Sequence, residues 1–169
     1  DLAEPALMGI VNATPDSFSD GGELATTSDR VARALSLADA GATIVDVGGQ
    51  SGITGVPEVP VDEEVARVVP VVAGIHAARP DLVVSVDTYR PEVVRAVLDA
   101  GAAIVNDVSG LAGDPGMGAV VAARRAAFVL MHNRGRSDTM YARAQYGEVV
   151  REVGAELEAG VALAEAAGV

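Results

Sequence analysis

The sequence predicts an α/β protein in which parallel strands alternate with helices. Short apolar segments of about five residues recur along the chain, and they are too short and too rich in β-branched residues to be helices. Longer segments with apolar side chains at helical spacing separate them. Such alternation is typical of parallel strands joined by helical crossovers. We therefore expect five consecutive β/α units in the 169 residues.

The elements are expected in a regular order along the chain. The strands are predicted at 7–11, 43–47, 82–87, 103–107 and 127–132. The helices are predicted at 28–40, 62–78, 91–100, 117–124 and 146–167. Ser28 and Asp62 are the expected N-caps of the first two helices, while Gly41 and Gly101 suit helix C-termini. The continuous apolar character of the second strand indicates a strand covered on both faces.

The composition excludes several classes of function. Acidic side chains number 24 against 12 basic ones, which gives a formal net charge of −12. Because the basic residues form no cluster, this charge argues against binding to nucleic acid or to an anionic membrane. The absence of cysteine excludes disulfides, thiolate metal sites and cysteine nucleophiles. Neither a secretory signal pattern nor an apolar run of about 18 residues is found, so we expect a cytoplasmic protein.

Two long loops follow the first two strands. The first, at 13–22, is rich in Pro, Ser, Asp and Gly and comes directly after Asn12. Its length and composition predict a mobile functional loop. The second loop covers 48–57. No G-x-G-x-x-G motif follows the first strand, and the chain has no P-loop, so a Rossmann dinucleotide site is not expected.

A polar residue ends every predicted strand. These residues are Asn12, Asp46, Asp87, Asn106 and His132. An open doubly wound sheet and a (β/α)₈ barrel both fit the alternation of elements, but in a barrel the five strand ends converge on the face where active sites are built. Carboxylates accept hydrogen bonds from adjacent N–H groups, and carboxamides both donate and accept. The set therefore suits a flat, nitrogen-rich heterocycle.

At these positions the sequence resembles a known family. The run at 8–22 closely resembles the first signature of dihydropteroate synthases, and 46–51 resembles the second. The segments 86–88, 106–110 and 130–132 fall in the family's order and spacing. The resemblance implies a (β/α)₈ TIM barrel, of which this chain covers about the first five β/α units. It also implies a transferase of folate biosynthesis, which condenses 6-hydroxymethyl-dihydropterin pyrophosphate with p-aminobenzoate and releases pyrophosphate with the help of Mg²⁺.

The resemblance implies a role for each of five residues. Asp87 and Asn106 match positions that hydrogen-bond the pterin ring, and Met131 matches a residue that packs against it. Asn12 matches the position near the pyrophosphate and its Mg²⁺, and Ser51 lies in the second loop, near the amine substrate. Asp87 and Asn12 are thus the candidate catalytic residues, and Asn12 is the candidate metal ligand.

Other acidic and polar side chains receive no role in the chemistry. Nothing in the spacing of Asp46 and His132 demands chemistry, and we interpret both as structural residues. Asp16 and Asp20, four residues apart in the first loop, are weak candidates for a metal pair.

The second loop departs from the family pattern. Where the family reads Glu-Ser-Thr-Arg-Pro-Gly, this chain reads Gln-Ser-Gly-Ile-Thr-Gly at 50–55. Gly52 lacks the hydroxyl and Ile53 lacks the cation of the loop that orders the amine and the pyrophosphate. One alternative is therefore a pterin-binding paralogue with weak, altered or no synthase activity. Another is a folate-binding barrel of the methyltetrahydrofolate methyltransferase type, against which the loop at 13–22 argues.

The chain is expected to be a single dihydropteroate synthase-like, pterin-binding domain, 1–169, whose C-terminal portion is missing. Five strands cannot close a barrel of eight, so the first and fifth are expected to expose unpaired apolar edges. The five units alone are not expected to be a competent synthase. The expected partners are small molecules, the pterin pyrophosphate and p-aminobenzoate, with no nucleic acid, no membrane, and a homodimer for the full-length protein.

Overall fold

The computed structural model contains one five-stranded parallel sheet, and it describes residues 5–14, 26–50, 57–114, 116–135 and 140–169. The strands follow one another in space as they do in sequence. They are β1 (Met8–Asn12), β2 (Ile44–Gly48), β3 (Val83–Asp87), β4 (Ile104–Asp107) and β5 (Ala127–Leu130). All five predicted strands are confirmed, with boundaries shifted by one or two residues.

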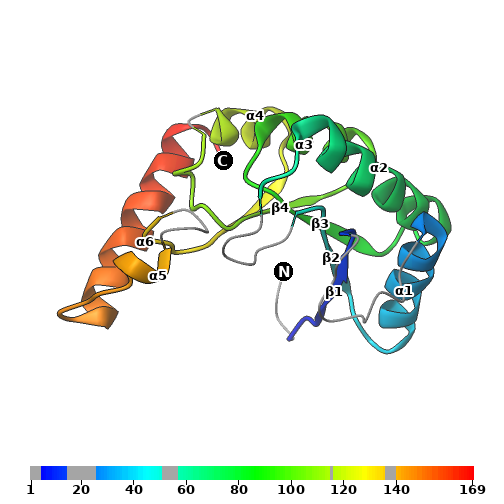
Figure 1. Cartoon of the computed structure of the whole chain (residues 1–169), viewed down its shortest axis with the longest axis horizontal. Coiled ribbons are helices and arrows are strands. Elements are labelled where there is room, and N and C mark those ends of the chain that lie inside the picture. The colour runs from blue at the N-terminus through cyan, green and yellow to red at the C-terminus, as the bar shows by residue number, and fades with distance from the viewer. Residues whose placement is uncertain (1–4, 15–25, 51–56, 115, 136–139) are drawn as a thin grey trace.

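The helices decide between the two architectures that the sequence allows. They are α1 (Thr27–Asp39), α2 (Val61–Ala78), α3 (Pro91–Asp99), α4 (Met117–Arg124), α5 (Met140–Arg143) and α6 (Val149–Ala166). Helices α1 to α4 form an arch along one side of the curved sheet (Figure 1). A doubly wound sheet has helices on both faces and reverses its strand order, whereas the described residues form a sheet of unbroken order with its helices along one face. The chain therefore forms five successive β/α units of a (β/α)₈ barrel.

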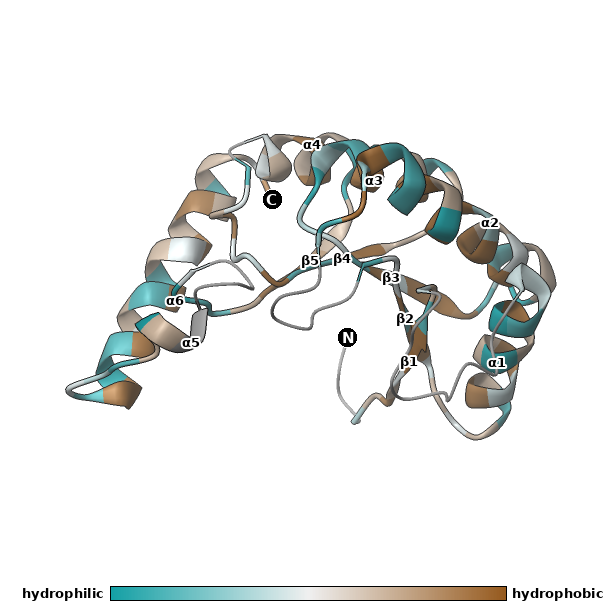
Figure 2. Cartoon of the chain, viewed as in Figure 1, coloured by the Kyte–Doolittle hydropathy of each residue, from teal (hydrophilic) through white to brown (hydrophobic). Residues whose placement is uncertain are grey.

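The two faces of the sheet differ sharply in burial. On the outer face, toward the helices, Val45, Val47 and Val86 are completely buried and belong to the main hydrophobic core. On the inner face, Met8 and Ile10 are 41% and 64% exposed. Apolar residues are prominent in the strands, although β4 carries as many polar as apolar residues (Figure 2). The second strand itself meets the expectation of burial on both faces, since residues 45–48 are all buried, whereas the inner face of β1 is open. No helix lies over the inner face in the described part of the chain.

Two predicted helix caps are wrong. Helix α1 begins after Thr26, whose Oγ1 accepts a hydrogen bond from the Asp29 N–H at 3.2 Å, while the Asp29 carboxylate accepts one from the Thr26 N–H at 2.9 Å. This reciprocal capping box satisfies two free N–H groups, so Thr26 replaces the predicted Ser28 as N-cap. Helix α2 begins after Pro60, which places Asp62 inside the first turn, where its charge favours the helix dipole.

Other boundaries follow the sequence more closely. Gly41 and Gly101 have φ of 108° and 112° directly after the C-caps of α1 and α3, which confirms both as helix stops. Strand β5 ends at Leu130, so His132 lies beyond it. The single helix predicted at 146–167 is α6, and the short α5 precedes it. Within the described residues, no helix combines the length and the apolarity needed to cross a bilayer.

Candidate functional site

Three predicted site residues lie at the carboxyl ends of neighbouring strands. Asn12 of β1 is in register with Gly48 of β2, Gly48 with Asp87 of β3, and Asp87 with Asn106 of β4. Residues in register share a face of a sheet, and these belong to the inner face. A Cβ at Gly48 would lie 3.8 Å from Asp87 Oδ2 and 3.9 Å from Asn12 Oδ1. Gly48 therefore leaves space between the two side chains.

Asp46, which was expected at a strand end and interpreted as structural, lies in one cluster with Asn12, Asp87 and Asn106. It lies two residues before Gly48 and therefore shares its face, one row below the strand ends. The Asn106 Nδ2 donates a hydrogen bond to Asp46 Oδ2 at 3.0 Å. Asp46 is only 7% exposed. The sequence does contain a signal for this position, because side chains alternate between the two faces along a strand. Strand β2 continues to Gly48, and Asp46, two residues earlier, therefore lies on the inner face with Asp87 and Asn106.

The surroundings of Asp87 raise the pKa of its carboxyl group. Burial, followed by the negative charges of Asp46, Glu64 and Asp107, raises the pKa of Asp87 from 3.8 to about 7. The carboxyl group is therefore poised between its neutral and charged forms near neutral pH. In the charged form it is a strong acceptor for two adjacent N–H donors. A strongly perturbed acid on a half-open face is typical of a functional site.

The residues just before the second loop are held by side chains from two neighbouring elements. The Gln50 Nε2 donates to the Tyr89 hydroxyl at 3.0 Å, and Arg67 of α2 donates to the Gly49 carbonyl at 3.0 Å. Ser51, Gly52 and Ile53 of the loop itself lie outside the described residues, as does most of the first loop, 15–22. The predicted role of Ser51 therefore stays a prediction.

A buried ionic network holds the chain after the second loop. Glu64 of α2 is 2% exposed and accepts hydrogen bonds from Thr88 Oγ1 at 2.7 Å and from Arg90 at 2.8 Å. Burial raises the pKa of Glu64 despite these two partners. The same guanidinium donates to the Val59 carbonyl at 2.6 Å. The network thus ties the start of α2 to the end of β3, beside Asp87.

Met131 is held at the end of β5 by backbone contacts. Its N–H donates to the Asp107 carbonyl at 3.2 Å, and its side chain is 40% exposed. Gly110 lies against it with φ of 63°, and a Cβ at Gly110 would come within 2.5 Å of the Met131 oxygen. Only glycine fits this close approach. The backbone of Met131 is therefore fixed beside Gly110 and Asp107, and its contact with the pterin ring stays a prediction.

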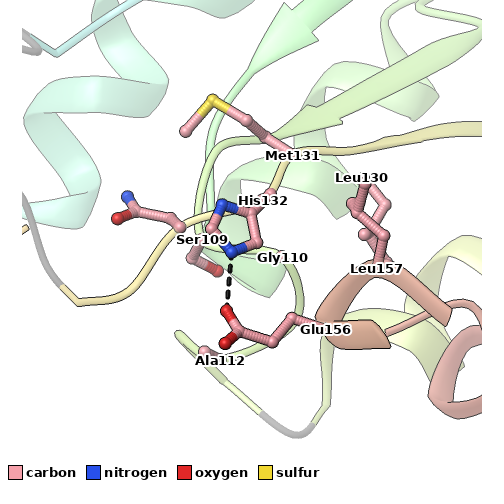
Figure 3. Close-up of a pocket in the computed structure, with 9 residues that line it drawn as sticks. Ser109, Gly110, Ala112, Leu130, Met131, His132, Glu156 and Leu157 are labelled. Carbon is pink, nitrogen blue, oxygen red and sulfur yellow. Dashed lines mark hydrogen bonds and ion pairs between the residues drawn. The ribbon is translucent and has the colours of Figure 1, made fainter. Parts of the chain in front are cut away.

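His132 does not join the cluster. Its Nε2 lies 2.6 Å from Glu156 Oε2 of α6, and its ring points away from the Met131 side chain (Figure 3). Arg134 pairs with the same Glu156 and stacks on Tyr146, with 4.0 Å between the guanidinium carbon and the ring centroid. These contacts fix α6 to the chain after β5. The expected convergence of all five strand ends is wrong for His132, whose contact with Glu156 agrees with its interpretation as a structural residue.

The oxygen donors at the strand ends suit a magnesium ion carried by a substrate. Among the described residues, no group of three or more His, Asp or Glu side chains has the arrangement of a metal site. Mg²⁺ is commonly held by one or two protein oxygens together with substrate phosphates and water. The carboxamide oxygen of Asn12 is a hard ligand of this type, so the residue fits such a shared site.

The sequence matches proteins of one family over nearly its whole length. The family model described as pterin binding enzyme matches residues 8–169. The dihydropteroate synthase of Escherichia coli K12 is 44% identical over 169 residues, and that of Mycobacterium leprae is 46% identical over 169 residues. The chain spans 59% of the length of each of these two relatives.

Solved structures agree with this assignment. A Xanthomonas albilineans dihydropteroate synthase with 4-aminobenzoic acid is 45% identical and superposes with a TM-score of 0.88 over 99% of this chain and 59% of that one. The same enzyme in complex with 7,8-dihydropteroate is 43% identical, with a TM-score of 0.83 over 100% of this chain and 58% of that one. The chain therefore belongs to the pterin-binding enzyme family, and its sequence and fold are similar to those of dihydropteroate synthases.

Proposed function

We propose that this chain carries the pterin-binding part of a dihydropteroate synthase. The reaction joins 6-hydroxymethyl-dihydropterin pyrophosphate to p-aminobenzoate and releases pyrophosphate. The observation that carries the proposal is the register row of Asn12, Asp87 and Asn106 on the inner face, which presents acceptors and donors to a flat heterocycle. Relatives that contain 4-aminobenzoic acid or 7,8-dihydropteroate support the choice of substrates.

The proposed chemistry is a dissociative substitution at the pterin methylene. The carbon–oxygen bond to pyrophosphate breaks, the leaving group keeps the electron pair, and the resulting cation is delocalised into the ring. The arylamine nitrogen then attacks the methylene and loses a proton. Asp87 holds the ring through its N–H groups, and its negative charge stabilises the cation as it forms. No covalent enzyme intermediate is needed.

The leaving group is proposed to meet Asn12. Its carboxamide lies in the same row as the ring-binding residues, across the gap left by Gly48. A bound Mg²⁺ would neutralise charge on the departing pyrophosphate. Asn12 is proposed to supply one oxygen to that ion and so to place the pyrophosphate beside the ring.

The second candidate function is a pterin-binding paralogue with weak, altered or no synthase activity. The composition of the second loop favours it, because Gly52 and Ile53 replace the hydroxyl and the cation of the family pattern. The hydrogen bonds of Gln50 to Tyr89, which follows β3, and of Gly49 to Arg67 of α2 concern only the base of that loop. The two functions therefore share the ring site and differ at the amine site.

The test measures pterin binding and product formation separately in the whole protein. Product analysis with the pterin pyrophosphate, Mg²⁺ and p-aminobenzoate is expected to detect dihydropteroate, and Asp87→Asn is expected to abolish pterin binding. Asp81→Asn is the matched control, because it removes the same charge from an exposed position before β3. A protein that binds pterin yet forms no product, even after Gly52→Thr and Ile53→Arg, would establish the paralogue. A protein that binds no pterin would refute both functions.

The remaining properties proposed for the whole protein are a homodimeric state and a cytoplasmic location. Light scattering of the purified protein and fractionation of cells test them directly. The proposed partners are the two small-molecule substrates alone.

A further inference from the structure

Asp46 and Asn106 form a hydrogen-bonded pair in which Asp46 is buried and Asn106 is half-buried. Asp46 is buried one row below the strand ends, with 7% of its surface exposed. Asn106 lies in the upper row and is half-buried. Their hydrogen bond runs from Asn106 Nδ2 to Asp46 Oδ2 over 3.0 Å. The Asn106 carboxamide is therefore held from below and presents its remaining groups to the inner face.

The chemistry of the pair determines how the carboxamide is oriented. A carboxylate only accepts hydrogen bonds, so the amide nitrogen of Asn106 must face Asp46. The carbonyl oxygen and the second N–H are left for a ligand. A neutral partner that both donates and accepts would permit the amide to rotate by half a turn and exchange these groups.

Stability alone gives no reason for a buried acid at this position. The Asp46 Oδ1 is buried and has no hydrogen-bond partner in the described part of the chain, and the neighbouring Ser85 Oγ is in the same condition. Burying a carboxyl group for one hydrogen bond to a neutral amide costs more than it returns. A functional requirement on Asn106 accounts for the presence of Asp46.

We propose that Asp46 is a positioning residue that turns the carbonyl oxygen of Asn106 toward the ligand and so makes the site selective for a dihydropterin over the oxidised pterin. The inference rests on the proposed pterin site and names its selectivity. In a 7,8-dihydropterin, the ring nitrogen at position 8 carries a hydrogen and donates. In the oxidised pterin the same nitrogen is an acceptor, while the edge with the 2-amino group is unchanged. In the proposed pose, the 2-amino edge lies against Asp87 and position 8 lies against the Asn106 oxygen. Asp87 can then bind both rings, whereas a fixed acceptor at Asn106 favours only the dihydropterin.

The test compares the affinities of two probes in variants of the whole protein. The probes are 6-hydroxymethyl-7,8-dihydropterin and 6-hydroxymethylpterin, and their dissociation constants are measured by calorimetry without oxygen. Wild-type protein is expected to prefer the dihydropterin. Asp46→Asn permits both orientations of Asn106 and is expected to lower this preference about tenfold, the scale of one buried hydrogen bond. Ser85→Ala is the control, because Ser85 lies beside Asp46 in the same row and its hydroxyl makes no hydrogen bond to the Asn106 amide.

A second variant separates the proposed role from a general loss of structure. Asp46→Ala removes the acceptor by truncation and is also expected to lower the preference, with circular dichroism as the check on folding. A preference unchanged in both folded variants would overturn the inference and leave the proposed function standing. Wild-type protein that binds neither probe would overturn the proposed function and, with it, the inference.

Discussion

Replacing Asp87 with asparagine is expected to stabilise the folded protein at neutral and higher pH. The reason is that burial and three neighbouring acids raise the pKa of Asp87 from 3.8 to about 7. The folded state therefore binds the proton more tightly than the unfolded state does. This contribution to stability is complete below about pH 4 and is lost as the pH rises through about 7. Asparagine has a similar shape and carries no charge, so the variant escapes that loss.

The size of the effect follows from the shift in the pKa. A rise from 3.8 to about 7 is about three units, and each unit corresponds to about 1.36 kcal/mol, which gives about 4 kcal/mol. Asp87 is not completely buried, and water on the inner face weakens the penalty. We therefore expect Asp87→Asn to raise the free energy of unfolding by about 2–4 kcal/mol above about pH 7.5 and by almost nothing near pH 4.

Urea denaturation of both proteins across this pH range measures the difference directly. Titrating groups that do not interact with Asp87 are common to both proteins and cancel in the comparison, whereas the charges of Asp46, Glu64 and Asp107 act on Asp87 itself and are part of the measured effect. A difference in unfolding free energy that does not grow between about pH 4 and 7 would refute the reasoning. Loss of pterin binding in the same stabilised variant would show that Asp87 is retained for function at the expense of stability.

Two further predictions concern the frame around the site. Arg90→Met leaves Glu64 buried without its ion-pair partner and is expected to lower the free energy of unfolding by about 3 kcal/mol in denaturant titrations; an unchanged midpoint would contradict the role of the network. Thr26→Ala removes the capping box with Asp29 and is expected to cost about 1 kcal/mol in the same assay, whereas Ser28→Ala, at the position wrongly predicted as the cap, is expected to cost little.

The order of the elements was predictable because each one has a local cause. Five short β-branched runs and the glycines at 41 and 101 mark strands and helix ends whatever the rest of the chain does. The caps were less predictable, because Thr26 and Ser28 both have side chains that can cap a helix. The choice depends on which residue has Asp29 three positions ahead.

Part of the site was also predictable from local sequence. Asn12, Asp87 and Asn106 each end an apolar run, and the ends of parallel strands meet at one edge of a sheet. Asp46 was among the expected strand ends, but its position one row below Asn106 and the exclusion of His132 were not predictable in this way. Both depend on where a strand ends in register with its neighbours, and one residue of difference turns a side chain to the other face.

The sequence by itself determined the β/α repeat, the acidic character of the protein and the polar strand ends, because these properties reside in single residues and their spacing. Only the tertiary structure decided that the sheet is singly wound, that Asp46 lies beneath Asn106, and that His132 turns toward α6. These properties arise from the register between strands that are distant in sequence. The acidity of Asp87 is of the same kind, because its pKa is raised by burial and by charges on α2, β2 and β4.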